Sequence, residues 1–406
     1  MSQSKVVTHT LANGLMVLCE ESPASQSVGL GFFVKTGARD ETIKESGVSH
    51  FLEHMLFKGT KKRSALDITF HMGNIGAQSN AFTSEENTVY YTTVLPEYRA
   101  VGQEILSDMM RPSLNQSDFD TEKNVILEEI ALYQDKPQFY LFENATHHFF
   151  DGHTVGNSVL GTPDSIKALT RDEMQAYFDR RYAPNNIVFA CAGKIVAEDV
   201  IAQVEELCGS WKRQETPRQY VSFSAKERGK VFKKPNLQQN HVLFFADGPS
   251  AQDDDRYAMG LLSMMLGDST GSRMYYELIQ NGLAEGAGCD TDERDQVGNF
   301  YAYVVTSPEN LDQGAEITKS IIATPRKFSE ADLTRAKTKS ISRMVASGEL
   351  PMGRLMALGT EWQYLQKIHN LKTAIAEVKA VTVADIERAL ERYTLSPLSE
   401  YRMVSE

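Results

Sequence analysis

Residues 46–60, SGVSHFLEHMLFKGT, place two histidines and a glutamate within five consecutive positions of an otherwise apolar segment. The spacing of the apolar residues predicts a helix with two faces, because each helical residue advances by about 100°. One face carries Phe51, Leu52, Met55 and Leu56. The opposite face carries His50, Glu53 and His54. Ser46 or Ser49 can cap the start of this helix, so the apolar face anchors it and the polar face is left for chemistry.

The two histidines stand four residues apart and therefore lie one turn above each other on the helix. At this spacing two imidazoles can bind one metal ion, and ligand sets of this kind hold zinc. Glu53 lies beside both rings and can act as a general base towards a water that the metal makes more acidic. H-x-x-E-H is the inverted order of the zinc-protease motif H-E-x-x-H. The alternative is that all three residues are solvated on the exposed face of an amphipathic helix.

A hydrolytic zinc site needs three protein ligands and an open position, so a third ligand must come from elsewhere in the chain. Residues 118–135, DFDTEKNVILEEIALYQD, predict an amphipathic helix with several carboxylates. One stripe of that helix contains Glu122, Val125, Ile126, Glu129 and Tyr133. Buried carboxylates are unfavourable without a compensating cation, which predicts Glu129 as the third ligand and Glu122 as a supporting acid. Alternatively, both carboxylates flank the core and reach water.

The composition is typical of a soluble globular protein with more than one domain. The chain has 406 residues, 41% hydrophobic and 24% charged, and a length of roughly 150 residues per domain favours two or three domains. Forty-two basic against 54 acidic residues give a net charge of -12, which argues against nucleic acid and anionic membranes as partners. The four cysteines lack a metal-binding spacing and are predicted to be buried free thiols of a reducing compartment. They are Cys19, Cys191, Cys208 and Cys289.

The N-terminal sequence, MSQSKVVTHTLANGLMVLCEE, contains no apolar stretch of signal-peptide length and no arginine-rich presequence. No run of 18 apolar residues that could span a bilayer occurs in the chain. The predicted location is therefore cytoplasmic, and no membrane partner is expected.

The order of predicted helices and strands indicates an α+β (α/β layered) fold with two similar lobes. A charged stretch poor in large apolar residues divides the chain into an N-terminal lobe at 1–215, a linker at 216–232 and a C-terminal lobe at 233–406. Each lobe closes on a similar phrase, in which a threonine begins an amphipathic helix before a strand, first at Thr170 and again at Thr382. This echo predicts two diverged copies of one fold, although two amphipathic helices can also look alike by chance.

Four segments together resemble one known family of enzymes. They are HFLEHMLFKGT, NAFTSEENTVYY, VILEEI and VLGTPDSIKALT. The family is that of the inverted-motif (inverzincin) zinc metallopeptidases, which includes pitrilysin, insulin-degrading enzyme and the mitochondrial processing peptidase, and the length is similar to its short two-lobed branch. The resemblance implies two homologous lobes, each a mostly antiparallel sheet packed with helices, of which only the first is catalytic. It also implies one Zn²⁺ per chain, with His50, His54 and Glu129 as ligands, Glu53 as the base and Glu122 as an acid beside the metal.

The segment NAFT is similar to an edge strand of the family that pairs with an extended substrate. Its residues are Asn80, Ala81, Phe82 and Thr83. In such β-augmentation, main-chain hydrogen bonds provide affinity for many sequences, and side-chain pockets provide preference. The resemblance therefore implies that these four residues bind the peptide substrate. Without it, Asn80 and Thr83 would be interpreted as ordinary turn residues.

One part of the second lobe departs from the family pattern. Active single-chain members carry an arginine and a tyrosine in a phrase similar to ELRxxxGLAY, where both hold the substrate backbone. This sequence has YYELIQNGLAEGAG, with Ile279 in place of the arginine and Glu285 in place of the tyrosine. A related partner subunit that carries the pair can complete the site. Alternatively, Arg273 with Tyr275 or Tyr276 replaces it.

The predicted function is that of a zinc metalloendopeptidase that hydrolyses extended peptides or small unfolded proteins. Two lobes alone leave such a site open to solvent, so a homodimer or a heterodimer with a related subunit is expected. The competing interpretation is a non-catalytic scaffold subunit of the same fold, which the missing arginine and tyrosine favour. A second metal site at His147, His148 and His153 is not expected, because no acidic or cysteine side chain accompanies them at helical spacing.

Overall fold

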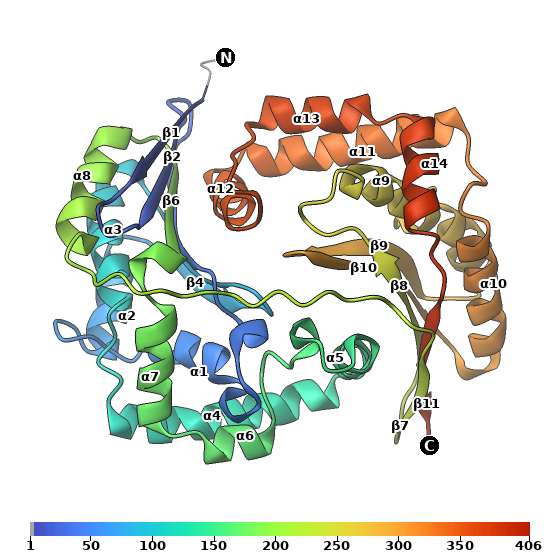
Figure 1. The fold of residues 1–406 in the computed structure, drawn as a ribbon, viewed down its shortest axis with the longest axis horizontal. Coiled ribbons are helices and arrows are strands. Elements are labelled where there is room, and N and C mark those ends of the chain that lie inside the picture. The colour runs from blue at the N-terminus through green and yellow to red at the C-terminus, as the bar shows by residue number, and fades with distance from the viewer. Residues whose placement is uncertain (1–3) are drawn as a thin grey trace. The chain divides into compact units, whose positions relative to one another are not determined.

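The computed structural model describes residues 4–406, which form two compact units. The first unit contains residues 4–131, 157–219 and 345–370, and the second contains residues 132–156, 220–344 and 371–406. Each unit is built around one β-sheet with helices packed on it, which confirms the predicted mixed fold with two lobes (Figure 1). Within residues 4–406, no helix combines the length and the apolar character needed to cross a membrane.

The first unit is built on a six-stranded sheet. Its strands are β1 (Lys5–Thr10), β2 (Met16–Glu21), β3 (Val28–Val34), β4 (Gln78–Thr83), β5 (Thr88–Val94) and β6 (Ile187–Gly193). They follow the order β1-β2-β6-β3-β5-β4, and all neighbours are antiparallel except β2 and β6. In the loop between β1 and β2, Gly14 has a φ of 92°, a value that glycine adopts without strain.

The second unit is built on a five-stranded sheet. Its strands are β7 (Gly229–Lys234), β8 (Asn240–Gly248), β9 (Gly286–Arg294), β10 (Val297–Thr306) and β11 (Ser399–Ser405). They follow the order β7-β11-β8-β10-β9, and only β7 and β11 are parallel. The second sheet thus matches five strands of the first. The matching strands are β7 with β2, β11 with β6, β8 with β3, β10 with β5 and β9 with β4. The two sheets repeat one topology, as the sequence echo predicts.

Helices cover both sheets. The first unit contains α1 (Val48–Met55), α2 (Ala65–Asn74), α3 (Arg99–Met109), most of α4 (Gln116–Asp135), α6 (Pro163–Ala168), α7 (Arg171–Arg181), α8 (Ala197–Cys208) and α12 (Pro351–Leu365). The second contains α5 (Pro137–Phe150), α9 (Arg256–Gly267), α10 (Leu311–Ala323), most of α11 (Glu330–Gly348), α13 (Leu371–Ala380) and α14 (Val383–Arg392). Thr170 caps α7 and Thr382 caps α14, each within a capping box, so the echo marks matching helix starts.

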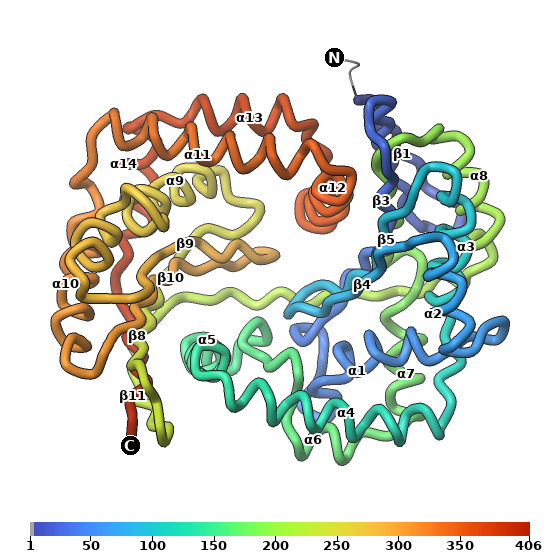
Figure 2. The backbone as a smooth tube through the Cα atoms, turned by 180° about the vertical axis from the view of Figure 1, so that it is seen from behind, coloured from blue at the N-terminus to red at the C-terminus, as the bar shows by residue number. Residues whose placement is uncertain are grey.

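Each unit includes one helix from the other half of the sequence. α12 lies against β3 and β6 of the first sheet (Figure 2), where Leu355 and Leu358 join the buried core. α5 lies against β8 and β11 of the second sheet, where Leu141 and Phe149 are buried. The predicted boundaries separate the two sheets along the chain, except that β7 begins at Gly229, within the predicted linker 216–232. The two compact units do not follow these boundaries, because each contains a helix from the other half of the sequence. Contacts between distant segments create this exchange, and no local pattern encodes it.

The ion pair between Glu20 and Arg354 anchors α12 to β2. Arg354 donates from Nε at 2.9 Å and from Nη2 at 2.8 Å to Glu20 Oε2, and both side chains are nearly buried. Replacing Glu20 by alanine leaves the buried guanidinium without its partner, so we expect Glu20→Ala to lower the free energy of unfolding by about 3 to 5 kcal/mol. The neighbouring pair of Lys5 and Glu21 is more exposed, and Lys5→Ala should change stability by less than about 1 kcal/mol.

Tryptophan fluorescence during urea unfolding tests this prediction, because it reports on the unit that contains the ion pair of Glu20 and Arg354. The chain has 2 tryptophans, Trp211 and Trp362, and both belong to the first unit. A Glu20→Ala variant whose fluorescence transition matches that of Lys5→Ala would show that the buried pair does not hold α12 in place.

Candidate metal centre

α1 presents the motif histidines on a helix that is firmly packed on its apolar side. Phe51 and Leu52 are fully buried, and Phe51 stacks on Phe119 with ring centroids 4.7 Å apart. His50 is buried, whereas Glu53 and His54 are half-buried. The predicted serine cap is wrong: the N-cap residue is Gly47, and neither Ser46 nor Ser49 caps the helix by its side chain.

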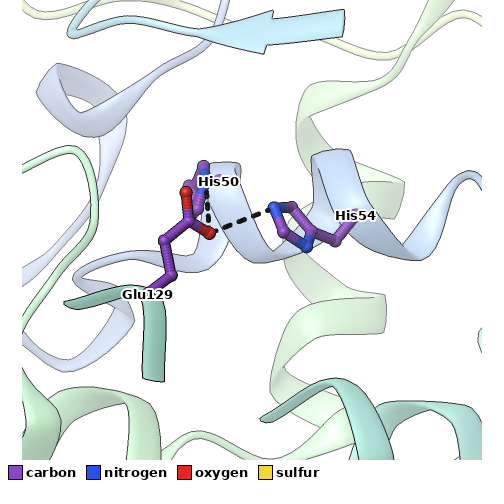
Figure 3. Close-up of side chains that lie close together, drawn as sticks. All are labelled: His50, His54 and Glu129. Atoms are coloured by element: carbon purple, nitrogen blue, oxygen red, sulfur yellow. Dashed lines mark ion pairs between the residues drawn. The ribbon is translucent and has the colours of Figure 1, made fainter. Parts of the chain in front are cut away.

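His50, His54 and Glu129 converge on one point (Figure 3). Glu129 Oε2 lies 3.7 Å from His50 Nε2 and 3.5 Å from His54 Nε2, and the three ligand atoms all lie within 4.8 Å of one another. Ligand atoms of a tetrahedral zinc site are separated by about 3.3 Å, given metal–ligand distances near 2.0 Å. The cluster therefore fits a single zinc ion after small side-chain movements. Within residues 4–406, no other group of three such side chains converges in this way.

The surroundings of the two rings shift their pKa values in opposite directions. Burial lowers the pKa of His50 to about 3, so its ring is neutral at physiological pH and offers a lone pair. Burial also acts to lower the pKa of His54, but the hydrogen bond with Glu122 and the negative charge of Glu129 outweigh it, and the pKa is raised. The raised pKa of His54 reflects the negative charge of the carboxylates around it, which a divalent cation bound in place of the proton would also balance.

Glu122 fixes the direction of the His54 ring. His54 Nδ1 donates to Glu122 Oε1 at 2.8 Å, which leaves Nε2 directed towards Glu129. Glu122 is buried in α4 and also pairs with Lys58. Burial raises the pKa of this carboxyl, but its bonds with His54 and Lys58 dominate and hold the pKa below its usual value. Val125, expected on the same buried stripe, is 42% exposed.

Glu53 is held by a side chain from the first sheet. Thr83 Oγ1, at the end of β4, donates to Glu53 Oε2 at 2.6 Å. Burial raises the pKa of Glu53, and the charge of Glu129 acts in the same direction, against the effects of Thr83 and His54. A raised pKa brings a carboxylate closer to the range in which it accepts and returns a proton at neutral pH. The sequence carries no signal for this contact, because Thr83 and Glu53 belong to different elements.

β4 lies at one edge of the first sheet. Among the strands that the structure describes, it pairs only with β5, so its other edge is open. Asn80, Ala81 and Phe82 belong to this strand, and Phe82 is 41% exposed. An open edge of this kind has the main-chain donors and acceptors that an added strand needs.

The region where the family pattern is interrupted lies in the second unit. Ile279 ends a π-helical turn, and Glu285, just before β9, accepts a hydrogen bond from Gln239. Arg273 donates to the carbonyls of Ile321 and Thr324 at the end of α10. The Arg273 guanidinium thus satisfies helix carbonyls, which argues against it as a replacement for the missing arginine.

The histidines at 147, 148 and 153 each contact a different group of the protein, and the four cysteines are buried. His147 Nδ1 contacts the carbonyl of Gly156, His148 Nδ1 contacts the hydroxyl of Tyr401, and His153 Nε2 contacts the carbonyl of Val221. These three rings are directed at different protein groups. All four cysteines are buried free thiols, as predicted: Cys19, Cys191, Cys208 and Cys289.

Comparisons with known proteins agree with this geometry. Residues 16–163 match the family described as Insulinase (Peptidase family M16), and residues 168–340 match the Peptidase M16 inactive domain. An uncharacterized zinc protease of Mycobacterium tuberculosis is 31% identical, over 95% of this chain and 90% of its own. The uncharacterized zinc protease YmxG of Bacillus subtilis is 29% identical, over 92% of each chain. A solved structure of a protease from Helicobacter pylori has the same fold, with a TM-score of 0.91 at 21% identity, covering 98% of this chain and 99% of that one.

Proposed function

The chain belongs to peptidase family M16, and on this premise we propose that it is a zinc-dependent endopeptidase that hydrolyses extended peptides or small unfolded proteins. The convergence of His50, His54 and Glu129 beside Glu53 supports the proposal most directly. A pure scaffold subunit has no physical need for these polar side chains to meet on one half-buried face, because unpaired buried charge is unfavourable.

In the proposed reaction, Glu53 moves the proton. Zinc, when bound by His50, His54 and Glu129, would supply Lewis acidity towards a water molecule and the scissile carbonyl group. Glu53 accepts a proton from the attacking water and returns it to the leaving amine. Thr83 holds one oxygen of that carboxylate, which leaves the other oxygen to face the water.

The substrate in this proposal lies along the open edge of β4 as an additional strand. The main-chain groups for this pairing come from Asn80, Ala81, Phe82 and Thr83. Pairing through the main chain tolerates many peptide sequences. Ile279 and Glu285 stand where the family's arginine and tyrosine are expected, so we include a dimer in the proposal, either a homodimer or one with a related subunit that carries the pair. The cytoplasmic location stays a prediction from the sequence.

Substitutions of Thr83 test whether its hydroxyl positions the base, Glu53, or whether Thr83 only binds the substrate. Thr83→Val keeps the shape of the side chain but removes the hydroxyl that donates to Glu53. A hydrogen bond to a charged group contributes about 1.5 to 3 kcal/mol, so we expect kcat to fall by roughly 10- to 100-fold with little change in KM. Thr83→Ser should restore kcat. An increase in KM at constant kcat would instead assign Thr83 to substrate binding alone.

The proposed function is tested on the purified chain by metal analysis and by cleavage of a quenched peptide. We expect one zinc per chain and cleavage that a chelator abolishes and added zinc restores. A chain that binds no zinc at neutral pH would refute the assigned ligands. A chain that binds zinc but cleaves nothing, alone or with a related subunit, would favour the scaffold interpretation.

A further inference from the structure

α1 begins without a capping group of its own. Its N-cap, Gly47, has a φ of 91° and no side chain, and no acidic residue stands in the first turn. The first N–H groups of a helix have no partner within it. In a helix of eight residues that carries two proposed ligands, movement of the first turn would move the ligands as well.

Glu41 supplies the missing acceptors from outside the helix. Its Oε2 accepts from the Gly47 N–H and its Oε1 from the Ser49 N–H, each at 2.7 Å. The side chain is buried, with 6% of its surface exposed. One carboxylate thus bridges two N–H groups at the positive end of the helix, a position that favours negative charge.

The segment that carries Glu41 is itself held in place. The preceding carboxylate, that of Asp40, receives two bonds from Arg218, at 3.0 and 2.8 Å. It also pairs with Arg181 of α7 at 2.9 Å, and all three of these side chains are at most 5% exposed. A rigid base of this kind lets Glu41 fix the position of the helix start rather than follow it.

His50 is the ligand that depends most on this cap. It directly follows Ser49, and its buried Nδ1 has no hydrogen-bond partner among residues 4–406. His54, by contrast, is directed by the carboxylate of Glu122. The direction of the His50 ring is therefore set by the helix backbone and by packing, and the backbone at this point is the part that Glu41 holds.

We propose that Glu41 is a positioning residue of the metal centre, which holds the first turn of α1 so that His50 Nε2 faces Glu129. The inference rests on the proposed zinc role of His50 and adds to it a residue from outside the H-x-x-E-H motif. Glu41 does not touch the metal ligands themselves. It acts through the backbone of Ser49.

The test compares Glu41→Gln with Glu45→Gln in the full chain. Glutamine keeps the size of Glu41 but replaces one of its two acceptor oxygens by an NH2 group, which cannot accept from an N–H. Glu45 is a control from the same segment. Its carboxylate accepts from the Thr42 N–H at 3.1 Å and from the Thr42 hydroxyl, and it pairs with Arg180 of α7 at 2.8 Å, whereas the two backbone bonds to α1 come from Glu41.

Zinc affinity is measured by competition with a chromophoric chelator at pH 8, above the pKa of about 7 to which burial raises the Glu41 carboxyl. Loss of a hydrogen-bond partner of a metal ligand typically weakens metal binding by about 10- to 100-fold. Because Glu41 acts one step further away, through the Ser49 backbone, we expect a loss at the lower end of this range, about 10-fold, for Glu41→Gln. The visible spectrum of the cobalt-loaded protein should also change. Glu45→Gln should match the wild type in both measurements.

The outcomes separate this inference from the proposed function. If the wild type binds no zinc, the proposed function fails. If the wild type and Glu45→Gln bind zinc and Glu41→Gln binds it equally well with the same cobalt spectrum, only the role of Glu41 is overturned. If Glu41→Gln does not fold, Glu41→Asp replaces it, because aspartate is too short to reach both N–H groups. Wild-type affinity in a folded Glu41→Asp would then contradict the inference.

Discussion

Replacing Glu53 by glutamine is expected to remove peptide cleavage while leaving zinc binding intact. Glutamine has the shape of glutamate, and its carbonyl oxygen can still accept the hydrogen bond from Thr83, but it cannot take a proton from water near neutral pH. General-base catalysis contributes about 10²- to 10⁴-fold, so we expect kcat/KM to fall by at least that range. A quenched peptide assay with matched zinc contents measures the effect.

Two features make this substitution informative. Glu53 lies outside the cluster formed by His50, His54 and Glu129, so loss of activity would not follow from loss of metal. Glu128→Gln is a suitable control, because Glu128 is an exposed glutamate of α4. If Glu53→Gln retained more than a tenth of the wild-type activity, another residue would have to act as the base.

Replacing Glu129 by glutamine is expected to remove zinc and, with it, activity. Glu129 is the one carboxylate of the converging cluster, and its Oε2 lies within 3.7 Å of both ring nitrogens. The amide carries no charge to balance the cation, and only two imidazoles then remain to hold it. Loss of a side chain that hydrogen-bonds to a metal ligand already weakens binding by about 10- to 100-fold, so loss of a ligand itself should exceed about 100-fold.

Chelator competition measures the affinity, and Glu128→Gln again gives the control. Glu128 is the neighbour of Glu129 but lies about 100° around the helix, and it is exposed. We expect Glu128→Gln to bind zinc as the wild type does. Equal zinc affinity of the Glu128→Gln and Glu129→Gln variants would exclude Glu129 as a ligand.

Local patterns predicted the elements that carry the site. The apolar stripe of 46–60 predicted α1, although this helix is shorter than the segment, and the pattern of 118–135 predicted α4 within a few residues. The threonines at 170 and 382 marked two capping boxes in matching places of the repeated topology. These predictions succeed because helix periodicity and capping depend on residues only three or four positions apart.

The contacts that refine the site were not predictable in the same way. The cap of α1 was expected from a neighbouring serine but comes from Glu41, since Gly47 has no side chain and the backbone folds back to bring that carboxylate to it. Thr83 reaches Glu53 only because β4 passes beside α1. Arg273 was a candidate for binding substrate, yet its guanidinium is directed to the carbonyls that end α10.

The sequence by itself determined the helix that carries H-x-x-E-H, the choice of Glu129 and Glu122 as candidate partners, and the repeat of two lobes. Each of these depends on periodicity within one element or on a resemblance between segments. Tertiary structure alone decided that α4 brings Glu129 to within 3.5 Å of His54 and that α12 packs on the first sheet. The physical reason is that such contacts join segments far apart in the chain, and their geometry is set by how the buried faces of whole elements pack together.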